Sequence, residues 1–451
     1  MTEPKLAVVI LAAGQGTRMK SSIPKVLHPV GNRPMVQHVL DVADGIGAAQ
    51  KVIVVAPGDK EVEKLAEAHG AVAVVQEHQR GTGHAVAATE GALAGFDGTL
   101  LVLFGDTPLL TAATLKALLA CMGKDASIAA LGFRAGDPTG YGRMVCDGDR
   151  LLAIVEHKDA TREERSIDLC FAGILAVDAK MLFDLLRRVK NQNAQGEFYL
   201  TDVIALARGI GLSSRPAEGS AEEMMGVNTQ AQLAEAEAAY QTRRRAELME
   251  AGVSFAAPET VFLSADTVIE QGVRIGPYVV FAPGVKVLSG AEIKAFSHLE
   301  GAVVGKGAVV GPFARLRPGA NLQEDVHVGN FVEVKNTILE RGAKANHLSY
   351  LGDARVGAGT NIGAGTITCN YDGFGKYRTD IGKNVFVGSN TALVAPVKLG
   401  NDSIVAAGSV ITKDVEAGAL AIARGQQEIR PGGAERVRAK AKARKRTRKK
   451  G

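Results

Sequence analysis

The chain has 451 residues and a net charge of +5, and it is long enough for two or three domains that each have a complete core. It lacks tryptophan, has 53 glycines and only 5% aromatic residues, a balance that favours an array of tight turns over a sandwich built on large rings. It contains no run of 18 apolar residues and no charged-then-apolar leader, which argues against membrane insertion and export and predicts a cytoplasmic protein.

The N-terminal half alternates between strand-like and helix-like segments. Lys5–Leu11 is a continuous apolar run, typical of a strand that is buried on both faces of a parallel sheet. The segments that follow are a helix at Met35–Ile46, a strand at Lys51–Ala56, a helix at Lys60–His69, and strands at Val72–Gln76 and Leu100–Phe104. This order predicts an α/β, Rossmann-like domain over residues 1–228, with ligand-binding loops at the carboxyl ends of its strands.

A helix and then a six-residue repeat are predicted beyond that domain. Residues 229–251 contain many strong helix formers and no glycine or proline inside the helix, so we expect a linker helix. An apolar residue then recurs at every sixth position in three runs: Ile269, Ile275, Phe281, Val287, Ile293 and Leu299; Val304, Val310, Leu316, Leu322, Val328 and Val334; Ile381, Val387, Leu393, Leu399, Val405 and Ile411.

A period of six residues fits neither an α-helix nor an alternating strand. It fits a solenoid in which each hexad makes one short strand and one corner, with the apolar side chains stacked inward. We therefore predict a parallel β-helix over residues 252–430, interrupted by loops near Glu340–Ser349 and at Cys369–Asp380. Loops inserted into a solenoid are usual places for function.

The last segment, residues 431–451, is predicted to be a basic, disordered tail. Ten Lys and Arg residues and no acid lie between Arg436 and Lys450, so the rest of the chain has a net charge of −5, which is five minus ten. Such a run can contact nucleic acid or anionic surfaces, or it can be a solvated tail; we do not expect a nucleic-acid-binding protein. The four cysteines lack metal-ligand spacing and indicate inert thiols in a reducing compartment.

A first candidate site follows the first strand. Gly14 and Gly16 let the backbone approach a phosphate chain, and Arg18 and Lys25 add positive charge for a pyrophosphate. The segment is not a P-loop and lacks the third glycine of a Rossmann fingerprint. Asp106, two residues after the strand Leu100–Phe104, places a carboxylate where a metal–nucleotide complex would lie, and Asn228 offers a second oxygen ligand.

A second cluster of polar residues lies within the six-residue repeat. His347 has Glu333 one strand away in the sequence, and Arg317, Lys335, Tyr350 and Asn361 are near them. A neutral imidazole can take a proton from an amine, and the Glu333 carboxylate could orient it. The two cations could hold a sugar phosphate. Single polar residues on a solenoid are mostly solvated, but this cluster predicts an active site.

These motifs together resemble a known family. Leu11–Met19 (LAAGQGTRM) with Pro24-Lys25 resembles the signature of sugar-1-phosphate nucleotidylyltransferases. With the six-residue repeat, the chain from Lys5 to about Arg424 resembles the bacterial bifunctional N-acetylglucosamine-1-phosphate uridylyltransferase / glucosamine-1-phosphate N-acetyltransferase family. The resemblance implies acetylation of glucosamine-1-phosphate by acetyl-CoA, then uridylylation by UTP to give UDP-N-acetylglucosamine for envelope polymers. It also implies Mg²⁺, a left-handed β-helix and a homotrimer with shared acetyltransferase sites.

The resemblance implies roles for individual residues. In the first half, Arg18 and Lys25 would form the phosphate clamp, and Asp106 and Asn228 would hold Mg²⁺. The positions that match contacts to UDP-N-acetylglucosamine are Leu11, Ala12, Ala13, Gly14, Lys25, Gln76, Gly81, Thr82, Asp106, Gly142, Glu156 and Asn228.

In the second half, His347 of the segment Asn346–Tyr350 matches the general base. The positions that match sugar-phosphate contacts are Arg317, Lys335, Tyr350 and Asn361, and those that match the acetyl-CoA groove are Ala364, Asn370, Tyr371, Ser389, Ala407 and Arg424.

Phe171 is a departure from the family, which usually has Asn-Thr-Gly where this chain has Phe171-Ala172-Gly173. A polar contact to sugar or ribose is therefore missing. Phe171 either packs in the core beneath the site, which the apolar neighbours Leu169, Cys170 and Ile174 favour, or lines the pocket as an apolar wall.

Two rival functions remain open. A single-activity pyrophosphorylase with a regulatory β-helix would not need His347 or Asn370-Tyr371. A non-enzymatic assembly subunit with the same pair of domains would not need Arg18, Lys25 and Asp106.

Overall fold

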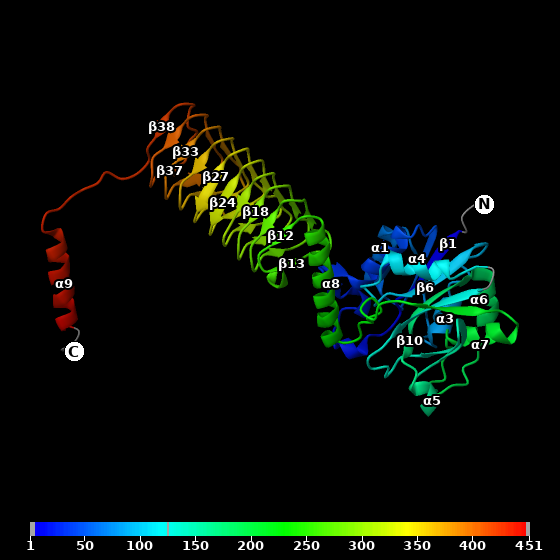
Figure 1. Ribbon diagram of the computed structural model, residues 1–451. Helices are drawn as coiled ribbons and strands as arrows, with labels where there is room; N and C mark the ends of the chain where they lie inside the picture. The colour runs from blue at the N-terminus through cyan, green and yellow to red at the C-terminus, as the bar shows by residue number, and fades with distance from the viewer. Residues whose placement is uncertain (1–4, 124–125, 448–451) are drawn as a thin grey trace. The chain divides into compact units, whose positions relative to one another are not determined.

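The computed structural model describes residues 5–123 and 126–447, which fall into two compact units (Figure 1). The first unit comprises the chain up to Glu250 together with Phe262–Thr267, and the second comprises Ala251–Val261 and the chain from Val268 onward. The first is an α/β domain and the second is a β-helix of three parallel sheets, so the predicted fold class is confirmed.

The first unit is built on one mixed sheet. Its main strands, in spatial order, are β11 (Ser214–Glu218), β7 (Ile128–Arg134), β10 (Leu169–Asp178), β6 (Thr99–Phe104), β1 (Leu6–Leu11), β4 (Gln50–Val55) and β5 (Val72–Val75), and the hairpin β8 (Arg143–Asp147) and β9 (Arg150–Val155) extends from β10. Strands β6, β1, β4 and β5 are parallel, whereas β10 runs antiparallel between β6 and β7. The carboxyl ends of the parallel strands therefore meet at one edge of the sheet.

Strand β1 is apolar throughout because both faces of the sheet are covered. Ala7, Val9 and Leu11 belong to the core on one face, which includes residues of α3 (Thr82–Ala87), α6 (Ala179–Leu186) and α7 (Asp202–Gly209). The alternate residues Leu6, Val8 and Ile10 belong to the core on the other face, which includes residues of α1 (Met35–Gly45), α2 (Lys60–Ala68) and α4 (Ala112–Ala120). The short helix α5 (Arg162–Arg165) lies outside both cores. Alternation along a doubly covered strand thus explains the unbroken apolar run.

Helix α8 (Gln230–Glu250) forms where the sequence predicts the linker, and it packs within the first unit. The added Cβ of a non-glycine residue at Gly31 would lie 2.4 Å from the Tyr240 ring, so this helix sits tightly against the loop after β2 (Pro29–Val30). The buried amide of Gln241 bonds the Leu263 backbone twice, at 2.9 and 2.7 Å, in β13 (Phe262–Leu263). These bonds explain why Phe262–Thr267 belongs to the first unit.

The second unit is a β-helix in which successive strands rotate through three parallel sheets. The first sheet holds β12 (Ser254–Phe255), β15 (Arg274–Ile275), β18 (Glu292–Ile293), β21 (Val309–Val310), β24 (His327–Asn330), β27 (Lys344–His347), β30 (Asn361–Ile362), β33 (Phe386–Val387), β36 (Ile404–Val405) and β38 (Leu420–Ala421). The second holds β16 (Val280–Phe281), β19 (His298–Leu299), β22 (Arg315–Leu316), β25 (Glu333–Lys335), β28 (Tyr350–Gly352), β31 (Ile367–Cys369), β34 (Ala392–Val394) and β37 (Val410–Ile411). The third holds β14 (Val268–Ile269), β17 (Lys286–Val287), β20 (Val303–Val304), β23 (Asn321–Leu322), β26 (Ile338–Leu339), β29 (Ala354–Val356), β32 (Thr379–Ile381) and β35 (Val397–Leu399).

The apolar residues of the three predicted runs are the inward residues of these strands. All of them are buried, with exposed fractions of at most 7%. In β14 to β23, each strand has two residues and the second one is buried. The hexad period therefore arises because one residue of each short strand points into the solenoid.

One of the two predicted interruptions is wrong. Residues 340–349 follow the regular coil, with Ala345 of β27 buried opposite Val328 of β24. The sequence pattern broke at Glu340 because the inward residue after Val334 is Leu339, only five residues further on, and the coil itself continues. The other interruption is present, because residues 370–378 form a loop between β31 and β32, with an isolated bridge between Tyr371 and Lys376.

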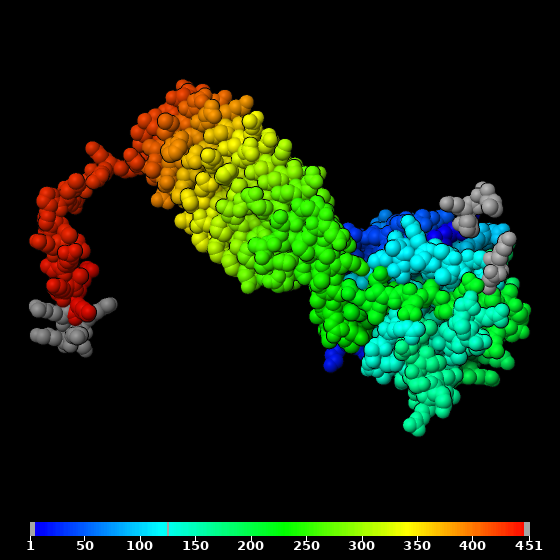
Figure 2. Space-filling view, in the orientation of Figure 1, coloured from blue at the N-terminus to red at the C-terminus, as the bar shows by residue number. Residues whose placement is uncertain are grey.

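The described part of the tail differs from the predicted disorder, because residues Gly433–Thr447 form helix α9. Residues 448–451 of the predicted tail lie outside the described residues. Alanine, lysine and arginine are strong helix formers, which explains helix formation despite the charge. Most of its described side chains are exposed to solvent (red in Figure 2). Among the described residues, none of the helices combines the length and apolar character needed to cross a bilayer.

Candidate active sites

The first unit has a cavity of about 580 Å³ at the carboxyl ends of its parallel strands. The backbone N–H of Gly105, after β6, donates to the Leu11 carbonyl at 2.9 Å, so the loops after β1 and β6 start side by side. The cavity is lined by all twelve residues that the resemblance implies for UDP-N-acetylglucosamine: Leu11, Ala12, Ala13, Gly14, Lys25, Gln76, Gly81, Thr82, Asp106, Gly142, Glu156 and Asn228.

The loop after β1 needs glycine at position 16. Gly16 has φ of 58°, in the left-handed region, and an added Cβ would lie 2.7 Å from the Cβ of Lys25. The missing side chain therefore lets the short helix that begins at Lys25 approach the loop closely. This packing brings the Lys25 side chain to the cavity.

Lys25 lies at the centre of a polar cluster in the cavity. Its Nζ donates to Asp106 Oδ2 in a close ion pair and to Asn228 Oδ1 at 3.1 Å, and both charged side chains of the pair are only 12% exposed. Arg18 donates to the same Asn228 oxygen at 2.9 Å. The structure thus brings the predicted clamp and the predicted metal ligands together.

The oxygens of Asp106 and Asn228 fit a divalent cation. One ammonium group contacts both, so a single small ion can reach both. Carboxylate and amide oxygens are the protein ligands that Mg²⁺ prefers, and substrate phosphates and water usually complete its shell.

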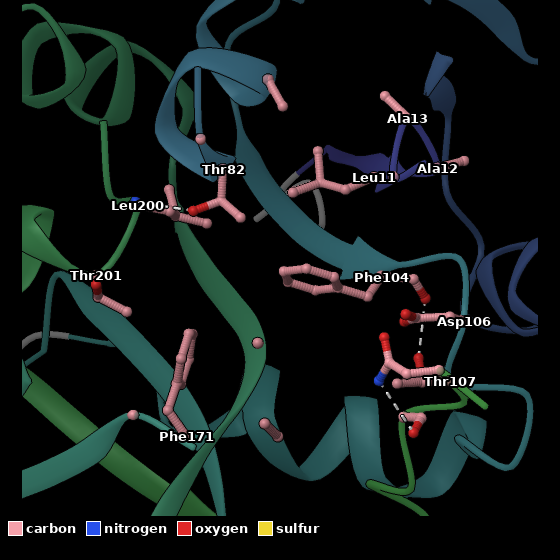
Figure 3. A pocket seen from close by; sticks show the side chains of 18 of the residues that line it. Leu11, Ala12, Ala13, Thr82, Phe104, Asp106, Thr107, Phe171, Leu200 and Thr201 are labelled. Carbon is pink, nitrogen blue, oxygen red and sulfur yellow. Dashed lines mark hydrogen bonds between the residues drawn. The ribbon is translucent and has the colours of Figure 1, made fainter. Parts of the chain in front are cut away.

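A second loop closes the cavity on the side of α3. The Leu200 N–H donates to the Thr82 hydroxyl at 3.1 Å, and the Gly83 N–H donates to the Phe198 carbonyl at 2.8 Å. Figure 3 shows Thr82 and Leu200 meeting at this wall. Gly81 has φ of 106°, and an added Cβ would lie 2.6 Å from the Phe198 carbonyl oxygen, so only glycine fits between these segments.

Glu156 lies at the far wall of the cavity, beside Gly142. An added Cβ on Gly142 would lie 3.6 Å from Glu156 Oε2. Burial raises the pKa of Glu156, while the hydrogen bond from the Thr201 hydroxyl, at 3.2 Å, opposes the increase. The carboxyl group therefore presents hydrogen-bond acceptors to the cavity.

Phe171 is both a core residue and a wall of the cavity. It is 9% exposed and packs in the core that contains Leu175, and it also lines the cavity, where its ring faces the open space together with that of Phe104 (Figure 3). The structure therefore combines the two alternatives, because the ring is buried in the core and also lines the cavity. Gly173, with φ of 82°, forms the bulge in β10 that directs this strand around the Phe104 ring.

Replacing Phe171 with asparagine is expected to act on both roles. The loss of a buried ring should destabilise the first unit by about 2–4 kcal/mol. The new amide should add one hydrogen bond to a sugar or ribose hydroxyl, which is worth about 0.5–1.5 kcal/mol and lowers the KM up to about tenfold. Thermal unfolding and uridylyl-transfer kinetics on the same variant measure the two effects. An unchanged KM would mean that the side chain at position 171 does not contact a sugar or ribose hydroxyl.

The second candidate site lies on the second sheet of the β-helix. Arg317, Lys335 and Tyr350 come from consecutive coils, since Glu333 pairs in register with Arg315 on one side and with Tyr350 on the other. Arg317 donates to Glu333 at 2.8 Å. The structure therefore brings these three predicted sugar-phosphate residues together.

Lys376 joins this group from the inserted loop. A side-chain contact with Lys376 and the charge of that residue lower the pKa of Lys335. Two ammonium groups that face each other favour an anion between them. Lys376 was not predicted from the sequence, although the loop Cys369–Asp380 was a signal for function.

His347 ends β27, in a regular coil and not in an insertion. Asn330 is its register partner on β24, and Asn330 Oδ1 accepts a hydrogen bond from His347 Nδ1 at 3.0 Å. The expectation that Glu333 orients His347 is therefore wrong, because Glu333 is paired with Arg317. In the neutral ring, an Nδ1–H that donates to this amide oxygen leaves the other ring nitrogen, Nε2, available as a base.

The predicted acetyl-CoA residues continue from His347 along one corner of the solenoid. Ala364, Ser389 and Ala407 follow the strands β30, β33 and β36, which succeed β27 in the first sheet. Arg424 donates to the Ala407 carbonyl at 2.8 Å. The distance from β27 to β38 is four strand-to-strand spacings, or about 19 Å. The residues along this corner can therefore contact a long extended ligand.

The other predicted residues have different positions. Asn370 is 7% exposed, and its amide donates to Asp353, which fixes the start of the inserted loop. Tyr371 is exposed in that loop. Asn361 lies on β30 of the first sheet, opposite Lys344, and not on the sheet that carries Lys335.

Comparisons with known proteins cover nearly the whole chain. Residues 8–168 match the MobA-like NTP transferase domain family, and residues 378–413 match the hexapeptide repeat of succinyl-transferase family. A bifunctional protein GlmU from Paramagnetospirillum magneticum is 52% identical over 99% of both chains. A bifunctional protein GlmU from Rhodospirillum rubrum is 56% identical over 96% of this chain and 98% of its own. The chain therefore belongs to the GlmU family of bifunctional uridylyltransferases and acetyltransferases of UDP-N-acetylglucosamine synthesis.

Proposed function

We propose that the cavity of the first unit binds UTP and N-acetylglucosamine-1-phosphate, and that the β-helix binds glucosamine-1-phosphate and acetyl-CoA. The convergence of all twelve predicted nucleotide-sugar residues on one cavity carries this proposal. Mass spectrometry of the products from glucosamine-1-phosphate, acetyl-CoA and UTP tests it. UDP-N-acetylglucosamine supports both sites, whereas products without an acetyl or without a uridylyl group exclude one of them.

In the first site, the phosphate oxygen of the sugar attacks the α-phosphate of UTP, and pyrophosphate leaves. Lys25 and Arg18 lie where they offset the negative charge that develops on the phosphates. Asp106 and Asn228 would hold Mg²⁺, which supplies charge neutralisation at the phosphates when bound. The walls at Thr82 and Glu156 orient the nucleotide and the sugar for in-line attack.

In the second site, His347 is the general base. Its Nε2 takes a proton from the amino group of the sugar as that nitrogen attacks the thioester carbonyl, and the thiolate of coenzyme A leaves. Arg317, Lys335 and Lys376 hold the phosphate of the sugar. Asn330 keeps Nε2 directed at the amine by accepting a hydrogen bond from the Nδ1–H group.

We also propose a homotrimer that acts in the cytoplasm, with each acetyltransferase site shared between copies. Asn361 points outward from the first sheet, whereas Lys335 and Tyr350 point outward from the second. One ligand that contacts all three would need residues from a second copy.

A truncated chain that ends after Thr267 is expected to form UDP-N-acetylglucosamine from UTP and N-acetylglucosamine-1-phosphate without acetyl-CoA. One that ends at Glu250 should unfold at a lower temperature, because it lacks the Leu263 backbone that satisfies the buried Gln241 amide. Each of the two hydrogen bonds that are lost is worth about 0.5–1.5 kcal/mol. Thermal unfolding and product formation compare the two, and equal melting temperatures would contradict the assigned boundary.

A further inference from the structure

The side chain of Gln76 is a nearly buried polar group in the wall of the nucleotide cavity. It follows β5, is 4% exposed and lines the cavity. Its Nε2 lies 3.3 Å from the Gly81 carbonyl oxygen and 3.1 Å from His84 Nδ1. His84 belongs to α3 and does not itself line the cavity in the described part of the chain.

The partners of Gln76 fix which way its amide points. A carbonyl oxygen only accepts hydrogen bonds, so the nitrogen of the Gln76 amide, and not its oxygen, must face Gly81. The same nitrogen then faces His84 Nδ1, which must be the acceptor and therefore carries no proton. His84 is thus the neutral tautomer with its proton on Nε2. Burial, and secondly the charge of Arg80, lower the pKa of His84, which favours this neutral form.

Both amide hydrogens of Gln76 are therefore used within the protein. Its Oε1 receives no hydrogen bond from the residues that the structure describes. This oxygen is a free acceptor on a residue that lines the cavity. A ligand group beside it gains a hydrogen bond only if it is a donor, and a ligand acceptor at the same place would be repelled.

We propose that His84 is a positioning residue that selects the base: its Nδ1 holds the Gln76 amide so that Oε1 faces the cavity and accepts from a ring N–H. Uracil has this donor at N3, whereas cytosine has an unprotonated acceptor at N3. The inference rests on the proposed binding of UTP in this cavity. It assigns the preference for UTP over CTP to a residue outside the pocket.

The role of His84 depends on competition between two amide orientations. Without the Nδ1 acceptor, Gln76 keeps one long hydrogen bond to Gly81, whose carbonyl also accepts from the Ala85 N–H at 3.1 Å. Rotation of the amide by half a turn then becomes accessible. The rotated amide presents N–H groups to the cavity, which suit the N3 acceptor of cytosine.

The test compares His84→Phe, which keeps a ring beside Phe198, with the unmodified full-length enzyme. Steady-state uridylyl transfer is measured with UTP and with CTP. We expect the KM for UTP to rise about tenfold with kcat within about twofold, and the kcat/KM preference for UTP over CTP to fall about tenfold or more. His84→Gln, whose side-chain oxygen can accept from Gln76, should restore most of the preference.

The matched control is His78→Phe, which removes an exposed histidine from the loop between β5 and α3 and should leave the KM for UTP unchanged. An unchanged preference in a folded His84→Phe enzyme would overturn the inference, as would a preference that His84→Gln does not restore. If His84→Phe does not fold, His84→Leu takes its place. Failure of the unmodified enzyme to use UTP would instead refute the proposed function.

Discussion

Replacing His347 with alanine is expected to slow acetyl transfer by about 10²–10⁴-fold, the usual contribution of a general base. The imidazole donates a hydrogen bond from Nδ1 to Asn330. The substitution therefore removes an Nε2 nitrogen that is available as a base. Uridylyl transfer to supplied N-acetylglucosamine-1-phosphate should be unchanged, since that cavity belongs to the other unit. Both reactions are assayed on the same purified variant.

Two further variants make this result specific. His327→Ala removes an exposed histidine from β24, on the same sheet, and should leave acetyl transfer intact. Asn330→Ala keeps the imidazole but frees its ring, and the loss of one hydrogen bond should cost about tenfold in rate. A loss of less than tenfold in His347→Ala would mean that another group takes the proton.

The second large effect is expected from Asp106→Asn, which should abolish detectable uridylyl transfer and leave acetyl transfer intact. The substitution removes the carboxylate charge that would hold Mg²⁺ and that pairs with Lys25. A loss of about 4 kcal/mol of transition-state stabilisation corresponds to roughly 10³-fold in rate. The loss of rate is measured as the formation of UDP-N-acetylglucosamine at increasing Mg²⁺ concentrations.

Asp44→Asn is the matched control, because Asp44 pairs with Lys51 outside the cavity. It should leave both activities unchanged. An equal loss of both activities in Asp106→Asn would indicate misfolding, and full activity at ordinary Mg²⁺ would remove Asp106 from the proposed metal site. Comparison of thermal unfolding between the two variants separates these outcomes.

The fold was predictable where one residue type repeats at a fixed spacing. The inward residues of the β-helix follow each other closely in the chain, so their period is visible in the sequence. Strand β10 was not predicted, because its place between β6 and β7 depends on pairing with distant segments. The false interruption at residues 340–349 arose because the step from Val334 to the next inward residue, Leu339, is five residues and not six.

The site residues that belong to sequence motifs were predictable, whereas the residues that form hydrogen bonds with them were not. Lys25, Asp106 and His347 belong to recognisable patterns, whereas Asn330 becomes relevant only when the register of β24 and β27 is known. Phe171 shows the same limit, because its apolar neighbours suit both a core and a pocket wall. The structure places it in both.

The inserted loop between β31 and β32 has a consequence for folding of the solenoid. Regular neighbours such as Glu333 and Tyr350 lie 17 residues apart in the chain, whereas Ala354 and Thr379, whose coil contains the loop, lie 25 apart. Closing the longer segment costs only about 0.3 kcal/mol more in chain entropy, because this cost grows with the logarithm of length. A solenoid of short-range contacts can therefore acquire a loop that carries Lys376 with almost no penalty to its assembly, which makes such a loop an easy place for new chemistry to arise.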